Sequence, residues 1–498
     1  MSTVRAISQA LPERGEAVRG ALIAAGVALL AYYGIGKFGV VGLLTPAAVV
    51  LVAFMLRRPV GMMAALCVIT ILFEGKDFGL LSFGARLYAQ AYKGMTPLDI
   101  LVAITLLACA FNVIATKRRV FIPRPLVPAV LTLLLGMISG IVIGSEHGQS
   151  LRTTALAEHV LVYMLLLPMV VANLQVDRRH IIIFLGAMVA LADLKALLGL
   201  VEVVGHYGPS IEGRSTLTYY EPTANWVIMM ALLSICAALA GKVRLPRWMP
   251  LSAPLLLACL LLSYRRSFWI AAVLGLLIVV LLGLSPLGRR LLLPTVVLVA
   301  VAMWMVGSVS VQSQSPIVKR AESLSPAKLE QSPEARYRND ERANVLAAIS
   351  ENPITGLGMK VPWAATARTL SLENTEGREY VEVGALWFWL KLGILGLAAY
   401  VSFILGALLL SWRVWRRSPE GPMRAFGLAS LAAFLGLLPI EVTASFTGVE
   451  ARFTVVACIQ VGLLALLAKG AVPGGATAWE PAKLRIRRRE PLAAGNWR

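Results

Sequence analysis

Residues that usually hold metals or form disulfides are scarce in this sequence. The 498 residues include only five cysteines and four histidines. Each cysteine lies inside an apolar run and none is near another in sequence, which is typical of small buried hydrophobic residues. The sequence therefore excludes a disulfide scaffold and predicts neither a metal site nor a cofactor.

Charged residues are also scarce. They make up 15% of the chain, where an ordinary soluble domain has about 25%. Hydrophobic residues make up 58% and gather in runs of about 15–25 residues, separated by short polar stretches. This pattern is typical of a chain that spans a membrane, and it excludes a soluble multidomain enzyme and a disordered protein.

The apolar runs predict the number of membrane segments. They fall at 19–36, 39–56, 59–73, 98–115, 125–144, 158–174, 180–204, 224–241, 250–263, 268–284, 291–309, 384–411, 423–440 and 453–468. Two of these 14 runs, 59–73 and 250–263, are short for about 30 Å of hydrocarbon. We therefore predict an all-α integral membrane protein, a polytopic helical bundle of about 14 (12–14) transmembrane helices.

The net charge of +20 follows the predicted membrane topology. If the N-terminus is cytoplasmic and the segments alternate, every short inner loop is basic, as at Arg57-Arg58 and Arg178-Arg179. Both ends of the chain then lie inside, where the positive charge contacts anionic lipid. The lipid bilayer, and not nucleic acid, is the partner that this charge predicts.

One long polar stretch, residues 310–383, falls on the outer side. It separates membrane bundle residues 1–309 from membrane bundle residues 384–468, which precede a basic tail at 469–498. The tail is predicted to be cytoplasmic and disordered, because its lead-in is rich in proline, glycine and alanine.

The outer loop is predicted to contain a helix. Ser332-Pro333-Glu334 supplies an N-cap, a proline at the first helical position and an acidic first turn. The helix can run to about Ser350, where Asn352-Pro353 ends it before a turn at Gly356 and Gly358.

Arginines on the outer side need a reason, because they oppose the usual inside bias of positive charge. Five such residues are candidate substrate-binding groups: Arg214, Arg265, Arg266, Arg338 and Arg342. Structural alternatives remain open for them. The Arg214 loop suits an interfacial tyrosine belt, the Arg265-Arg266 pair suits snorkelling to outer lipid phosphates, and Arg338 suits pairing with Glu334.

Glu382 lies at the outer mouth of an apolar segment. A partly buried carboxylate there suits general-base chemistry, although pairing with Arg378 is the alternative. Arginine forks fit phosphate oxygens. Outer arginines and one carboxylate therefore suit transfer from a pyrophosphate-linked lipid donor to an alcohol, with a diphosphate as the leaving group.

Four stretches resemble the O-antigen ligase and O-antigen polymerase superfamily. RNDERANVLAAISENPITGLG (338–358) is similar to its outer-loop signature, and EVGALWFWLKLGILGL (382–397) to the following segment with a late Gly-x-x-Gly. SYRRSFWIAA (263–272) resembles its arginine hairpin, and GRSTLTYYEPTANW (213–226) its earlier arginine loop.

The resemblance implies a metal-independent, inverting glycosyltransferase of the bacterial inner membrane with a periplasm-facing site. Its implied partners are an undecaprenyl-pyrophosphate-linked oligosaccharide, an acceptor glycan and a chain-length regulator. Arg214 and Arg265 or Arg266 take the positions of pyrophosphate-binding arginines, and Arg338 that of the loop arginine.

Two departures favour a polysaccharide polymerase, for exopolysaccharide or O-antigen, over a lipopolysaccharide ligase. Ligases usually carry a His-Asn pair where this chain has Glu382-Val383, and a tryptophan where it has Arg342. The competing hypothesis is a lipid-linked glycan flippase or other secondary transporter that uses the intramembrane charges Asp193 and Lys195. A purely structural membrane subunit would leave the outer arginines unexplained.

Overall fold

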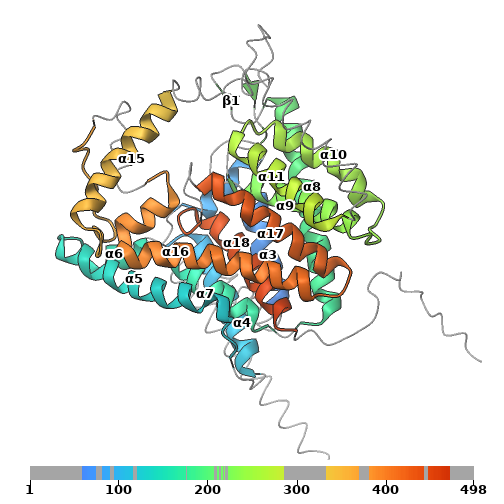
Figure 1. The fold of residues 1–498 in the computed structure, drawn as a ribbon, viewed down its shortest axis with the longest axis horizontal. Helices are drawn as coiled ribbons and strands as arrows, with labels where there is room; N and C mark the ends of the chain where they lie inside the picture. The colour runs from blue at the N-terminus through green and yellow to red at the C-terminus, as the bar shows by residue number, and fades with distance from the viewer. Residues whose placement is uncertain are drawn as a thin grey trace, which may run out of the picture.

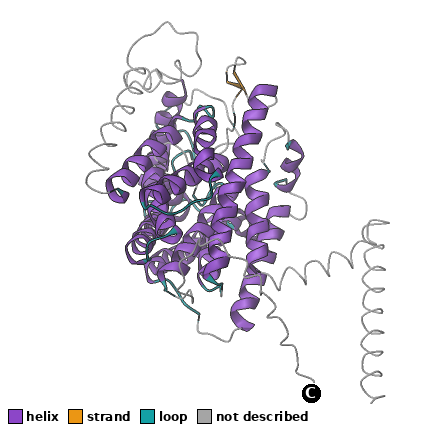
Figure 2. Cartoon of the chain, turned by 90° about the vertical axis from the view of Figure 1, so that its right-hand side faces the viewer, coloured by secondary structure: helices purple, strands orange, loops and turns teal. Residues whose placement is uncertain are grey.

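The computed structural model describes residues 59–73, 81–89, 95–115, 120–174, 176–206, 210–211, 215–216, 218, 222–284, 333–368, 381–441 and 447–470. The regular secondary structure of this part of the chain is helical apart from one antiparallel pair of two-residue strands, β1 (Ser210–Ile211) and β2 (Ser215–Thr216), as Figure 2 shows. The α-helices are α3 (Pro59–Leu72), α4 (Pro97–Ala115), α5 (Val127–Glu146), α6 (Leu151–Ala157), α7 (His159–Ala172), α8 (Arg178–Gly205), α9 (Pro222–Ala240), α10 (Trp248–Leu261), α11 (Arg266–Gly283), α15 (Pro333–Glu351), α16 (Gly384–Arg417), α17 (Pro422–Glu441) and α18 (Ala451–Ala468). The short 3-10 helices are η2 (Ser82–Leu87) and η3 (Arg124–Leu126).

The helical membrane architecture is confirmed. Within the described residues, eight helices are long and apolar enough to cross a membrane, and the bent pair α6–α7 makes a possible ninth span. Every predicted apolar segment in these residues coincides with a helix. Segments 19–36, 39–56 and 291–309 lie outside the described residues, so the total of about 14 stays a prediction.

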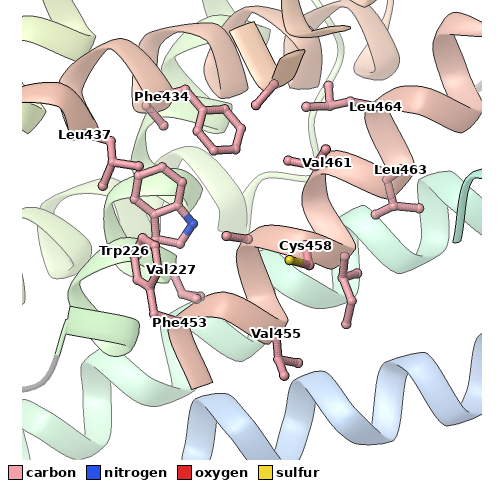
Figure 3. Packing of buried hydrophobic residues seen from close by; sticks show 14 of the residues in the cluster. Trp226, Val227, Phe434, Leu437, Phe453, Val455, Cys458, Val461, Leu463 and Leu464 are labelled. Atoms are coloured by element: carbon pink, nitrogen blue, oxygen red, sulfur yellow. The ribbon is translucent and has the colours of Figure 1, made fainter. Parts of the chain in front are cut away.

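The centre of the bundle is formed by α9, α17 and α18, which are the most deeply buried of the candidate spans. Trp226 of α9 packs between Phe434 of α17 and Phe453 of α18, with ring centroids 5.5 and 5.3 Å apart (Figure 3). A helix that is apolar on all sides is expected in such a central place.

The helix α16 breaks near its start. The sequence predicted one uninterrupted segment at 384–411, but Gly393 has non-helical angles (φ 65°, ψ −158°). The peptide that would continue the helix bonds elsewhere, because the N–H of Ile394 donates to the carbonyl of Ile354, 3.1 Å away. A side chain at Gly393 would overlap that carbonyl, which explains the glycine.

The turn after α15 fits into this break. Gly356 and Gly358 both have positive φ, as the sequence predicted for a turn. The N–H of Leu357, between the two glycines, donates to the carbonyl of Leu390 at 2.7 Å. The N–H of Met359, after the second glycine, donates to the carbonyl of Gly140 in α5 at 3.0 Å. Main-chain hydrogen bonds therefore fasten the turn after α15 to α16 and α5.

Replacing Gly393 by alanine should weaken the attachment of the loop to α16. We expect a loss of about 2–4 kcal/mol in the free energy of unfolding, since steric overlap adds to backbone strain. Gly148 is the matched control, because its φ is also positive (83°) but the space around it is open. Thermal unfolding in detergent measures both variants, and equal losses would contradict the proposed steric fit.

Candidate functional site

Arg338 and Glu382 are brought together by α15 and the start of α16. The Nε of Arg338 donates to Oε2 of Glu382. The two side chains are 45% and 30% exposed, so the carboxylate remains accessible. The pairings that the sequence had left open, Arg338 with Glu334 and Glu382 with Arg378, are not tested by this contact. The side chains of Glu334 and Arg378 lie outside the described residues.

A second carboxyl group, Glu341, lies beneath this pair. It is only 2% exposed, and its Oε2 accepts the main-chain N–H of Glu382 at 3.1 Å. Burial raises the pKa of Glu341 to about 7, and the charge of Glu382 adds to this effect, while the hydrogen bond from Glu382 and the charge of Arg338 oppose it. Burial also raises the pKa of the neighbouring Tyr337 phenol.

Sequence reasoning missed Glu341, although a signal was present. It lies four residues before Val345 and seven before Ala348, and these are buried positions on the face of α15 that packs toward the protein. An acidic residue on a buried helix face is unusual and needs a partner. Arg342, the other arginine predicted from this helix, is exposed.

The returning chain holds α15 in place through Asn344. This side chain is fully buried, and its Oδ1 accepts the N–H groups of Ala367 and Arg368 at 2.7 and 2.9 Å. Its Nδ2 donates to the carbonyl of Arg368 at 2.8 Å, and Asp340 forms an ion pair with the Arg368 guanidinium at 3.3 Å. The position of Arg338 and Glu341 therefore depends on this polar attachment.

The hairpin between α10 and α11 carries Arg265 and Arg266, which are both half-buried. Tyr264 turns the chain with a φ of 51°, and Ser263 Oγ accepts the N–H of Arg265 at 3.3 Å. Such a turn directs two adjacent arginines to one end of the bundle.

The stretch that carries Arg214 approaches this hairpin. Arg214 itself lies outside the described residues. Four residues later, the N–H of Thr218 donates to the carbonyl of Leu262 at 3.1 Å, and its hydroxyl donates to the carbonyl of Cys259 at 2.8 Å. Thr218 therefore links this stretch to the end of α10, next to Arg265.

The two halves of the predicted site lie on different helices of the bundle. The helix α15 packs against α16, whereas α11 packs against α9 and α17 (Figure 1). The structure therefore joins Arg338 to Glu382 directly, whereas Arg265 and Arg266 lie at the start of α11. Within the described residues, no group of three or more His, Cys, Asp or Glu side chains could hold a metal ion.

Lys195 and Asp193 contact different neighbours, as their spacing of two residues requires. Lys195 is 2% exposed, and its Nζ donates to the carbonyl of Leu72 at the end of α3, 3.0 Å away. Arg452 donates to the next carbonyl, that of Phe73, at 3.2 Å. Cations stabilise the C-terminal end of a helix, so Lys195 has a structural task here. Asp193 lies near Ser252 of α10 instead, and among the described residues its buried Oδ1 has no hydrogen-bond partner.

Residues 251–401 match the family model described as O-antigen ligase. The match supports membership of the O-antigen ligase superfamily. The match confirms the resemblance that the motifs suggested, and its range contains the Arg265-Arg266 hairpin, α15 and Glu382. Membership implies a membrane enzyme that transfers glycan from a lipid-linked donor to an acceptor polysaccharide. A search of curated proteins gave no match to the chain.

Replacing Asn344 by alanine should release residues 367–368 from α15. We expect trypsin to cleave after Arg368 about tenfold faster, because hydrogen bonds worth about 1–3 kcal/mol to the buried amide are lost. Asn339→Ala is the matched control, since Asn339 is exposed on the same helix. Unchanged cleavage of the Asn344 variant would show that this amide does not hold the loop.

Proposed function

We propose that this protein is a polysaccharide polymerase of the O-antigen ligase superfamily. It extends undecaprenyl-pyrophosphate-linked glycan in exopolysaccharide or O-antigen biosynthesis. The observation that carries the proposal is the accessible carboxylate of Glu382, which Arg338 and the N–H bond to Glu341 hold at the start of α16. The family match supports the reaction class.

In the proposed reaction, the acceptor sugar hydroxyl attacks the anomeric carbon of the donor. The new carbon–oxygen bond forms as the bond to the lipid diphosphate breaks, and the diphosphate leaves with the electron pair. The hydroxyl proton passes to Glu382. Attack from the side opposite the leaving group inverts the anomeric centre. Arg214, Arg265 and Arg266 balance the charge of the diphosphate, so the reaction needs no metal.

Arg338 acts on Glu382 and does not serve only as a phosphate ligand. Its bond to Glu382 orients the carboxylate until the acceptor arrives. Arg342 is exposed on the same helix, where a glycan or the rest of the loop can contact it. Both residues thus serve the acceptor side of the proposed site.

The proposed setting is the bacterial inner membrane, with the site facing the periplasm and both chain ends in the cytoplasm. The basic inner loops support this orientation. The pair Glu382-Val383, in place of a His-Asn pair, supports a polymerase over a ligase. A separate chain-length regulator is the expected protein partner.

The flippase alternative has less support. Its main argument was the presence of Asp193 and Lys195 within α8, but Lys195 binds the end of α3. A charge held by a helix terminus is poorly placed to follow a moving substrate. Asp193→Asn still separates the hypotheses, because it should stop transport but leave polymerisation at least partly active.

Replacing Glu382 by glutamine should abolish polymer formation in cells. The amide keeps the shape of the side chain but cannot take the acceptor proton, so we expect a loss of about 100-fold or more. Polymer length is read from glycan extracts on gels, with membrane levels of the protein measured in parallel. Glu420→Gln is the control, because Glu420 also pairs with an arginine but at another helix end. Wild-type polymer in the Glu382 variant would refute the role of this carboxylate.

A further inference from the structure

We propose that Glu341 is a positioning residue that fixes Glu382 through its main-chain N–H and tunes its basicity through charge. This inference rests on the proposed function, because it gives Glu382 the task of removing the acceptor proton. Glu341 itself does not reach the substrate, since its side chain is only 2% exposed.

The geometry shows why Glu382 needs such a residue. It lies just before Val383, the residue that precedes α16 and offers no side-chain cap to the helix. On one side Val381 is fully buried, and on the other Gly384 lies against the carboxylate of Glu441. The bond from Glu382 N to Glu341 Oε2, at 3.1 Å, completes the fixation of this short stretch from α15.

Glu341 also acts on Glu382 through its charge. Among the described residues, the groups that interact with it electrostatically are Glu382 at the start of α16, and Arg338 and Tyr337 on its own helix. When Glu341 is neutral, Arg338 faces one carboxylate. When Glu341 is ionised, two carboxylates share that single guanidinium. The second negative charge then favours transfer of the acceptor proton to Glu382 in the transition state.

The sign of the resulting pH dependence follows. Burial raises the pKa of Glu341 to about 7, so the group loses its proton as the pH rises through neutrality. The rate of transfer should therefore increase across this range. A rise of about three- to tenfold is expected, because only part of the proton is transferred in the transition state and the effect of the added charge is therefore partial.

Two substitutions separate the hydrogen bond from the charge. Glu341→Gln keeps an oxygen that can accept the N–H of Glu382 but carries no charge. Glu341→Ala removes both. Glu351→Gln is the matched control, since Glu351 is exposed at the end of the same helix. The experiment measures kcat and KM in proteoliposomes with an undecaprenyl-pyrophosphate oligosaccharide, between about pH 5.5 and 8.5 to span the pKa.

We expect wild type and the Glu351 variant to show the same increase in kcat through about pH 7. The Glu341→Gln variant should keep the low-pH rate of wild type at every pH. The Glu341→Ala variant should stay about tenfold below the low-pH kcat of wild type at every pH, with KM unchanged, since the carboxylate is no longer fixed and the charge is absent.

A wild-type pH profile in Glu341→Gln, or a wild-type kcat in Glu341→Ala, would overturn the proposal. If the alanine variant fails to fold, the pH profile of the glutamine variant decides alone. The Glu382→Gln variant distinguishes failure of the proposed function from failure of the task given to Glu341. Activity in that variant refutes the proposed function itself, whereas an inactive Glu382 variant beside a wild-type profile in Glu341→Gln refutes only the task given to Glu341.

Discussion

The candidate site at Arg338 and Glu382 depends on the attachment of one turn to a broken helix. The turn at Gly356–Gly358 gives its main-chain groups to α5 and α16, and α16 opens at Gly393 to receive them. Unpaired main-chain N–H and C=O groups are costly in a membrane protein, so the broken helix and the turn supply hydrogen-bond partners to one another. This attachment sets the place of α15, and with it the place of Arg338 and Glu341 beside Glu382.

The buried charges show a second consequence of the same constraint. The C-terminal end of α3 leaves carbonyl oxygens that have no partner within the helix. Lys195 and Arg452 reach two of them from α8 and α18, and Arg452 also pairs with Glu450 at 3.0 Å. A charge within an apolar segment invites a functional interpretation, yet here it closes the end of a helix. The neighbours of a charge, more than its depth, indicate its task.

Local patterns were enough to predict the helices but not the site. Apolar runs located each described membrane helix, and Ser332-Pro333-Glu334 with Asn352-Pro353 located α15, because both signals act within a few residues. The Arg338–Glu382 pair joins residues 44 positions apart, and no local pattern encodes it. The break at Gly393 was missed for a similar reason. Its cause is a carbonyl from the distant turn, while the surrounding sequence is an ordinary apolar helix.

The most direct test of the account is to supply purified protein in proteoliposomes with an undecaprenyl-pyrophosphate oligosaccharide on the loop side of the membrane. Mass spectrometry of the extracted lipids then follows the length of the glycan. The account predicts longer lipid-linked glycan together with free undecaprenyl pyrophosphate. Intact donor that crosses the bilayer with its glycan unchanged would contradict it and would establish transport.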